Sequence, residues 1–393
     1  MSELMKKVRE HAKIQGIDNV NIAAHIGTTP TSITYYFDGT NHMNFSKFIR
    51  MIHYIYKSEY DDLIIEYCEY CNHFPRAKKA QAVREALDWS MGRWNSELTQ
   101  HLLDLEKEYS PKTYEIYNLL FLSREGKISL KEFFRKVHYL PYNLKTSDQK
   151  NPEVQVLIDL CNMYYCHFRE DFEGIYYLSE FTFEKIDKIK SEFLRYSYTI
   201  CVNEMLSVYY LRSNKIKECK SSADKLIQDD VKALFPFTYL YGLYLMSEIY
   251  VFTNYQTSLY YINMAISEIE KMQFTHYKRK YDGMKKQKDF IKIVNEDYED
   301  LCLEDKAERL HYLAMLGDDQ SKEEANKVLE SIIEERKELT PFETCYKAIL
   351  NKDLKLMIRA EEMFMVGKDF YYIKLARKFI KEWGGIKESN KIN

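Results

Sequence analysis

The feature that most constrains the fold is a long succession of amphipathic stretches whose apolar residues recur at helical spacing. The 393 residues include only 12 glycines and 7 prolines, so few positions can interrupt a helix. The breaks between stretches are short, and some coincide with a proline, as at Pro111. No low-complexity segment separates them. The pattern therefore predicts an all-α chain made almost entirely of helices with short connections.

From about residue 58 the predicted helices follow one another as hairpins, with equivalent points recurring every ~35–45 residues, the period of helical-hairpin repeats. Their expected bounds are 59–71, 77–91, 94–109, 111–124, 129–138, 153–168, 171–186, 191–212, 215–228, 236–252, 256–272, 276–295, 297–316, 322–336, 342–350, 353–365 and 369–383. Hairpins that each bury one face against the next build a superhelical solenoid with a concave surface. Such a surface typically binds peptides or protein segments, although a scaffold without a ligand is the alternative.

The clearest repeat unit is Tyr239–Ile269. It places the small residue Ser247 in its first helix and Ala265 in its second, with Tyr250 between them. This arrangement resembles the tetratricopeptide pattern, with a loop that is one residue short. The chain after residue 57 is therefore predicted to be a solenoid of tetratricopeptide-like hairpins.

A different pattern precedes the solenoid, in the stretch Ile22–Gly39. Gly27 can adopt the left-handed conformation that turns the chain between two short helices. Thr29 is a good N-cap, and Pro30 falls at the first helical position, where its missing N–H costs nothing. Gly39 is placed to end the second helix. The stretch therefore predicts two helices joined by a tight turn, either a helix-turn-helix or an ordinary helical hairpin.

The second helix of this stretch leaves hydroxyl-bearing side chains on the face opposite Ile33 and Phe37. A helix-turn-helix needs such a face, because its second helix lies in the DNA major groove. The stretch is similar to the helix-turn-helix of phage repressors, with Pro30 where those proteins often have a polar base-contacting residue. The candidate DNA-binding residues are Thr29, Thr31, Ser32, Tyr35, Tyr36 and Lys47.

Charge divides the chain in the same way. Residues 1–57 hold seven Lys or Arg against four acids, a net charge of +3, which leaves −6 for the remainder of a chain whose total is −3. A basic head on an acidic body fits a small DNA-binding domain attached to something that does not touch DNA. We therefore expect a DNA-binding domain at 1–57 and a ligand-binding and dimerisation domain at 58–393.

Motifs for chemistry are missing from the sequence. There is no Gly-rich phosphate loop, no H-E-x-x-H and no G-x-S-x-G, so an enzyme is not predicted, and neither is a cofactor. Cys68 and Cys71 with His73 lack a second ligand pair nearby, so no metal site is predicted. No run approaches the ~18 apolar residues of a membrane span, which predicts a cytoplasmic protein without a membrane partner.

Three polar residues are candidates for holding a peptide. Asn203 interrupts an apolar helix, so it is either a pocket amide that pairs with a peptide backbone or a satisfied core group. Asn254 is a weaker candidate of the same kind. Asp369 could receive a peptide cation, although simple N-capping explains it equally well. The wide apolar face of residues 369–383 indicates either dimerisation or a cap on the solenoid.

A repressor-like head followed by degenerate tetratricopeptide-like hairpins resembles the peptide-sensing RRNPP regulators, and within them the arbitrium receptors (AimR) of Bacillus temperate phages. The resemblance implies a homodimer that grips operator DNA and activates a locus that keeps the phage lytic. It implies that a short imported peptide ending in Arg-Gly-Ala binds the solenoid, releases the DNA and favours lysogeny. It also places Asn203 against the peptide backbone and Asp369 near the peptide arginine. The alternative is a peptide-controlled protein-interaction adaptor that does not act through DNA.

Overall fold

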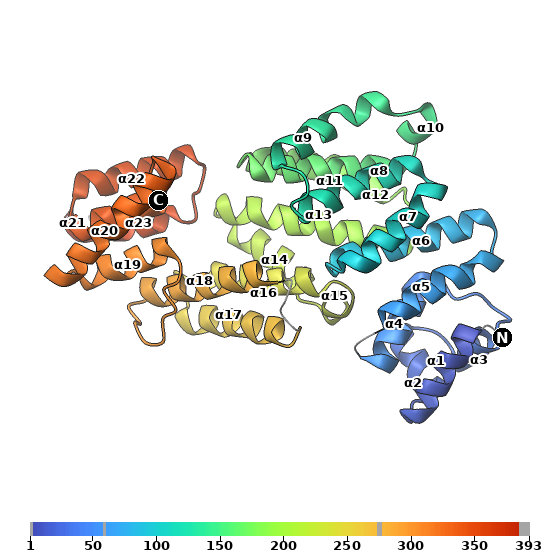
Figure 1. The fold of residues 1–393 in the computed structure, drawn as a ribbon. Coiled ribbons are helices and arrows are strands. Elements are labelled where there is room, and N and C mark those ends of the chain that lie inside the picture. The colour runs from blue at the N-terminus through green and yellow to red at the C-terminus, as the bar shows by residue number, and fades with distance from the viewer. Residues whose placement is uncertain (1–2, 58–59, 273–276, 385–393) are drawn as a thin grey trace, which may run out of the picture. The chain divides into compact units, whose positions relative to one another are not determined.

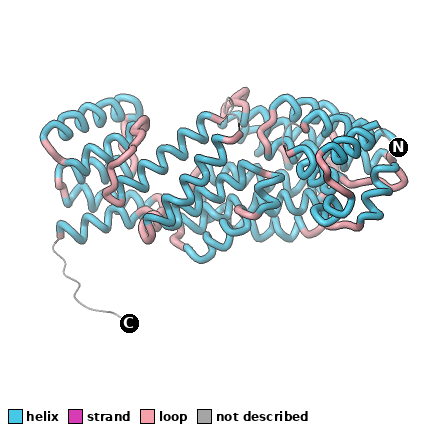
Figure 2. Tube along the Cα trace, turned by 90° about the horizontal axis from the view of Figure 1, so that it is seen from below, coloured by secondary structure: helices cyan, strands magenta, loops and turns pink. Residues whose placement is uncertain are grey.

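The computed structural model describes residues 3–57, 60–272 and 277–384. Within these ranges all regular structure is helical, comprising α1–α23 and two 3₁₀ turns, and no strand occurs among the described residues (Figures 1 and 2). The all-α prediction is confirmed. Two predicted helices begin at residues that the structure does not describe, residues 59 and 276. The expected domain boundary at residue 58 also lies outside the described residues.

The helices group into two compact units. Unit 1 comprises residues 1–205 and 228–239, and unit 2 comprises residues 206–227 and 240–393. Unit 1 therefore includes the whole predicted head together with the first hairpins of the solenoid. The expected division at residue 57 does not coincide with the boundary between the units.

The head begins unit 1. Its helices are α1 (Glu3–Ile14), α2 (Asn19–Ile26), α3 (Pro30–Asp38), α4 (Phe45–Tyr56) and α5 (Asp61–Tyr70). Each of α2, α3 and α4 starts with a side-chain cap: Asp18, Thr29 and Asn44 accept hydrogen bonds from backbone N–H groups of the first turn. The cap at Thr29 is the one that the sequence analysis predicted. Ile22 and Ile33 are fully buried, so the apolar faces of α2 and α3 meet in the head core.

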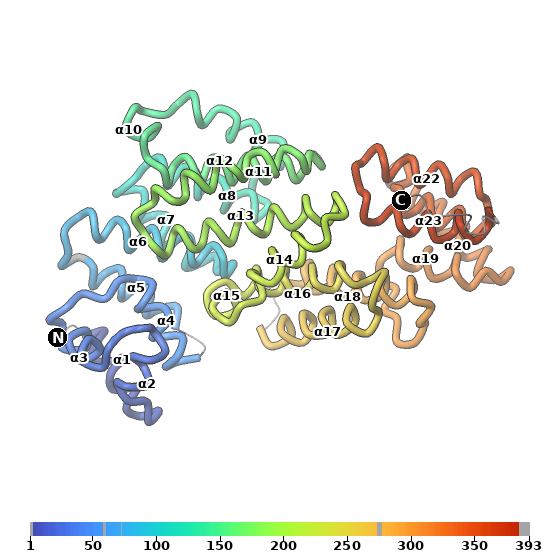
Figure 3. Tube along the Cα trace, turned by 180° about the vertical axis from the view of Figure 1, so that it is seen from behind, coloured from blue at the N-terminus to red at the C-terminus, as the bar shows by residue number. Residues whose placement is uncertain are grey.

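The rest of unit 1 consists of helical hairpins. The helices are α6 (Arg76–Gly92), α7 (Ser96–Tyr109), α8 (Pro111–Arg124), α9 (Leu130–Tyr139), α10 (Thr146–Gln149), α11 (Pro152–Phe168), α12 (Phe172–Ile186) and the start of α13 (Glu192–Arg212), with 3₁₀ turns at Cys71–His73 and Pro141–Asn143. Neighbours in sequence pack together, as for α6 with α7 and α11 with α12 (Figure 3). Apart from α10, which was not predicted, their bounds lie within two residues of the predicted ones.

Besides α10, one further helix of unit 1 was not predicted. The short α15 (Asp229–Leu234) packs against α4 of the head, where Asp230 pairs with Arg50 at 2.9 Å. Val231 and Leu234 are buried, and the ring of Phe235 contacts that of Phe193. A segment from the middle of the chain thus completes the packing of the head.

Unit 2 continues the hairpins to the end of the described chain. Its helices are α14 (Ile216–Leu226), most of α16 (Pro236–Tyr250), α17 (Tyr255–Glu270), α18 (Lys278–Val294), α19 (Lys306–Leu316), α20 (Asp319–Arg336), α21 (Pro341–Asn351), α22 (Leu354–Val366) and α23 (Ile373–Trp383). The small residues of the clearest repeat permit close packing, since the Ser258 hydroxyl donates to the Ser247 carbonyl at 2.7 Å and Ala265 is fully buried.

The predicted helix 297–316 is wrong over its first nine residues, because α19 begins only at Lys306. The carboxylate of Asp289 accepts the backbone N–H groups of Cys302 at 3.0 Å and Leu303 at 2.8 Å. These bonds satisfy donors outside a helix, and Asp300 and Leu303 adopt positive φ. A buried side chain of α18 therefore holds this connection in a non-helical path.

Candidate functional site

The turn between α2 and α3 has the geometry that its sequence predicts. Gly27 has φ 65°, in the left-handed region, and its N–H bonds to the Ala23 carbonyl. The Thr29 hydroxyl accepts from the Ser32 N–H at 3.2 Å, and Pro30 occupies the first turn of α3. Gly39, at φ 75°, ends the helix. The start of α3 is therefore rigidly defined relative to α2.

The outer face of α3 carries short polar side chains and one aromatic ring. Thr29 and Thr31 are exposed, Ser32 is half-buried, and Tyr35 is 45% exposed. The Thr29 and Ser32 hydroxyl oxygens lie 2.9 Å apart. Four of the six candidate DNA-binding residues thus lie along the start and first turns of one helix. Their hydroxyl groups can both donate and accept hydrogen bonds.

Tyr36 differs from the expectation of an exposed ring. Its side chain is only 9% exposed, because α3 turns it toward the head core beside Phe37. Its hydroxyl lies 3.5 Å from the ammonium of Lys47, the sixth candidate, which is half-buried. Tyr36 therefore positions a cation at the edge of α3 and does not present its own ring on the polar face.

Asn203 is buried in α13, within unit 1, at 3% exposure. Its amide nitrogen donates to the Thr199 carbonyl one turn earlier, at 2.7 Å. This bond orients the side chain along its own helix. Part of the hydrogen-bonding capacity of Asn203 is therefore used internally.

Asn254 and Asp369 both lie in unit 2 and both have local roles. The Asn254 side chain accepts the Thr257 N–H at 3.1 Å and so caps α17. Asp369 is 8% exposed and stands before α23, where it accepts the Tyr372 N–H at 3.1 Å. Asn254 is therefore a helix cap, which the sequence analysis did not foresee, whereas Asp369 bonds within the turn before α23, whose N-cap residue is Tyr372. The structure does not bring Asn203, Asn254 and Asp369 together within one unit.

Asp369 also belongs to a buried charged cluster that the sequence did not reveal. Its second oxygen pairs with the guanidinium of Arg212, from the end of α13, and that guanidinium lies 5.1 Å from the centre of the Tyr372 ring. The Tyr372 hydroxyl donates to the carboxylate of Glu248 on α16. Burial raises the pKa of Glu248 to about 7, against the opposing effects of Arg212 and the tyrosine hydrogen bond.

A signal for this cluster does exist in the sequence. Glu248 is the only charged residue in the apolar run 239–251, and an acid in such a run requires a buried partner. The sequence could not identify that partner, because Tyr372, whose hydroxyl donates to Glu248, lies 124 residues further along the chain.

The two cysteines that were considered as metal ligands are buried thiols. Burial raises the pKa of Cys68 well above its usual value and that of Cys71 to about 12, which favours the protonated form over the thiolate that binds metal. None of the described helices is both long and apolar enough to cross a membrane.

Comparisons with known proteins agree with this architecture. Residues 63–382 match the model of the family described as AimR transcriptional regulator-like. An uncharacterized protein of Bacillus anthracis is 25% identical over 233 residues, which cover 59% of this chain and 85% of that protein.

Two solved structures share the fold. The structure of selenomethionine phAimR aligns with a TM-score of 0.69 at 14% identity, covering 97% of each chain. The structure of phAimR with ligand aligns with a TM-score of 0.67 at 16% identity, covering 87% of this chain and 98% of the other. At these identities the likeness concerns the fold.

Proposed function

The chain belongs to the AimR-like family of transcriptional regulators, and we propose that it is a peptide-responsive DNA-binding protein that controls the lysis–lysogeny decision of a temperate phage. In this proposal a homodimer binds operator DNA and activates a locus that prevents lysogeny. A short imported peptide binds the solenoid and releases the DNA. The single observation that carries the proposal is the exposed, hydroxyl-rich face of α3 behind a tightly capped turn.

The proposed binding to DNA rests on the geometry of α3. In a helix-turn-helix the first residues of the second helix reach base edges in the major groove. Thr31 and Tyr35 are one turn apart and both exposed, so they are the proposed base-reading residues. Thr29 and Ser32 would contact the phosphates nearby, and Lys47 would add a cation at the edge of the helix.

DNA binding can be tested without knowing the operator. The full chain is used to select duplexes from a random library, and the affinity of the enriched duplex is measured by fluorescence anisotropy at several salt concentrations. We expect the logarithm of the binding constant to fall linearly with the logarithm of the salt concentration, because phosphate contacts release counterions. The double variant Thr31→Ala with Tyr35→Ala should lose at least tenfold in affinity for the selected sequence, whereas Tyr260→Ala, at another exposed tyrosine, should not.

Failure of the chain to enrich any duplex, or equal affinity of the double variant, would remove α3 from the DNA interface. A chain that also passes through immobilised heparin at low salt would favour the protein-interaction adaptor, for which the head is only structural.

For the peptide half, the proposed ligand-binding residues are Asn203, Asn254 and Asp369. The peptide arginine would approach Asp369, whose oxygens already accept bonds from Arg212 and from the Tyr372 backbone. We therefore propose that a ligand guanidinium shares or replaces the contact of Arg212. Exchange of one guanidinium for another keeps the buried carboxylate paired throughout.

Peptide binding is measured as the rise in thermal unfolding temperature on adding a synthetic peptide that ends in Arg-Gly-Ala. A ligand at one hundred times its Kd stabilises the folded state by about 2.7 kcal/mol. We expect Asn203→Ala to abolish the rise. Asn351→Ala is a matched control, because Asn351 makes the same hydrogen bond to the carbonyl four residues earlier but lies exposed at the end of α21. An unchanged rise in the Asn203 variant would exclude this residue from the ligand site.

The proposed dimer contact lies in the C-terminal helices, residues 353–383. Most of the apolar face of α23 is already buried within unit 2, including Leu375 and Phe379, so this face alone cannot serve as the contact. The apolar side chains that stay exposed are on α22 and the turn after it. These are Ile358, Met365, Val366 and Phe370. We propose this stripe as the surface that joins two copies.

A further inference from the structure

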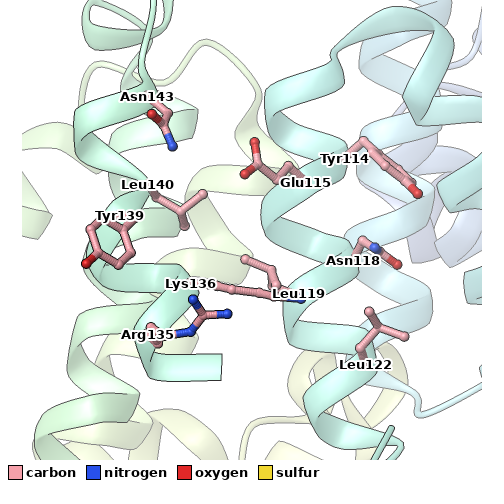
Figure 4. Close-up of a pocket in the computed structure, with 10 residues that line it drawn as sticks. All are labelled: Tyr114, Glu115, Asn118, Leu119, Leu122, Arg135, Lys136, Tyr139, Leu140 and Asn143. Carbon is pink, nitrogen blue, oxygen red and sulfur yellow. The ribbon is translucent and has the colours of Figure 1, made fainter. Parts of the chain in front are cut away.

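A cleft of about 360 Å³ lies between α8 and α9 in unit 1 (Figure 4). Its apolar wall includes Leu119 and Leu140. Figure 4 shows Glu115 of α8 facing Leu140 and Asn143 across the open space, with the Arg135 guanidinium at the other end of the cleft. The cleft therefore combines an apolar wall with polar groups at two separate ends.

The segment that forms one side of the cleft is unusually basic. Residues 127–150 hold six Lys or Arg against two acids, a net charge of +4, although residues 58–393 together carry −6. Lys136 pairs with Glu132 at 3.0 Å. The Arg135 guanidinium makes no ion pair or hydrogen bond with any residue that the structure describes, and it is exposed. Arg135 is thus available for an anion, and the adjacent Lys136 adds to the local positive charge.

The other end of the cleft carries side chains that can form hydrogen bonds with a planar, polar molecule. Asn143 lies at this end, and Asn118 lines the cleft one turn of α8 beyond Glu115 (Figure 4). No hydrogen bond to either side-chain amide occurs within the described part of the chain. Each amide can donate and accept at once. Glu115 faces Asn143 across the cleft and keeps acceptor capacity beside its ion pair with Lys112 at 2.6 Å. Tyr139, 54% exposed, also lines the cleft, and Figure 4 shows its ring turned away from Glu115.

We propose that this cleft binds a nucleoside monophosphate, with the phosphate at Arg135 and Lys136 and the base between Glu115 and Asn143. Arginine suits phosphate because its planar fork donates two hydrogen bonds to one anion. Amides and a carboxylate supply the donors and acceptors that the edge of a base requires. The volume is at the lower end for small-molecule sites, which suits one nucleotide better than an extended peptide.

This inference does not depend on the proposed peptide response, because none of its residues belongs to the α3 face or to the proposed peptide-binding residues. The test is isothermal titration of the full chain with the 5′-monophosphates of the four ribonucleosides. We expect at least one to bind with one-to-one stoichiometry. Adenosine or another nucleoside without phosphate should bind at least tenfold more weakly than its monophosphate, and so should inorganic phosphate.

Two variants distinguish binding in the cleft from unspecific attraction of the nucleotide to a positively charged surface. Arg135→Ala should weaken nucleotide binding at least tenfold. Lys131→Ala removes an exposed cation from the same helix that does not line the cleft, and it should leave the affinity within twofold. Circular dichroism checks that both variants keep the fold, because removing an exposed side chain should not disturb it. Asn143→Ala should change the ranking of the four bases without abolishing the phosphate contribution.

Any of the following results would overturn the proposal: no binding of any monophosphate, equal loss of affinity in the Arg135 and Lys131 variants, or inorganic phosphate binding as tightly as the nucleotides. A single-stranded hexanucleotide that binds tenfold more tightly than any monophosphate, with the same dependence on Arg135, would reassign the cleft to nucleic acid and also overturn it.

Discussion

Replacing Glu248 by Gln should make the protein more stable at alkaline pH. The Glu248 carboxyl is 8% exposed, and burial raises its pKa from 4.5 to about 7. The folded state therefore holds a proton more tightly than the unfolded chain. Between pH 4.5 and about 7 the folded state binds more protons, so the free energy of unfolding falls as the pH rises through this window and levels off above it.

The size of the effect follows from the two pKa values. A tenfold difference in proton affinity corresponds to about 1.4 kcal/mol, so the Glu248 charge costs on the order of 3 kcal/mol above pH 7. Glutamine has the shape of the protonated acid, and its amide oxygen can still accept the hydrogen bond from the Tyr372 hydroxyl. Arg212 keeps Asp369 as its partner in the variant. The variant and the parent should therefore have similar stability at pH 4.5 and differ by about 3 kcal/mol at pH 8.5.

The assay is urea unfolding followed by far-ultraviolet circular dichroism, which is sensitive in an all-helical chain, at pH values from 4.5 to 8.5. If the two units unfold in separate steps, the difference should appear in the step of unit 2, where Glu248 lies. Glu362→Gln, at an exposed acid of α22, is the control and should run parallel to the parent. A Glu248 variant whose stability also parallels the parent, or falls below it at pH 8.5, would refute the reasoning.

Three further perturbations test other parts of the molecule. Gly27→Ala should cost about 1 kcal/mol in thermal unfolding, because Gly27 has φ 65°, whereas Gly283→Ala, inside α18 with open space around it, should be neutral or stabilising; equal effects would contradict the turn geometry. Tyr117→Phe removes the hydroxyl that donates to buried Asp88 at 2.9 Å, so we expect the free energy of unfolding to fall by about 1–3 kcal/mol at pH 8. The loss should be smaller at pH 5, because burial raises the pKa of Asp88 to about 6 and the carboxyl is then largely protonated. A loss in urea unfolding that does not depend on pH would show that the carboxylate is not the cause. Val366→Asp should shift the chain from dimer to monomer in size-exclusion chromatography with light scattering, and an unchanged mass would exclude the stripe on α22 as the contact.

The sequence by itself determined the helices and the turn between α2 and α3. Gly27, Thr29, Pro30 and Gly39 act through contacts within a few residues of themselves, so their effect does not depend on the rest of the fold. The same holds for the repeat of hairpins, because the period of apolar residues sets which face of each helix is buried. These local rules gave the helical bounds to within a few residues over most of the chain.

The tertiary structure decided which side chains remain available. Tyr36 and Tyr35 are neighbours in sequence with the same chemistry, yet only the packing of the head buries one and exposes the other. The end of the interval 297–305 is held out of a helix because Asp289 accepts the backbone N–H groups of Cys302 and Leu303. Periodicity along one segment carries no information about such a partner.

Partners distant in sequence were the hardest to foresee. In the sequence, Asp369 could be a free acid or a simple cap, and only the fold shows that it pairs with Arg212, 157 residues earlier. Likewise, the role of α15 becomes evident only because the fold pairs Asp230 with Arg50, 180 residues away. The sequence specifies that buried charges need partners, since an unpaired charge in the interior is costly. Only the folded chain selects which partner each one receives, because that choice depends on which helices pack side by side.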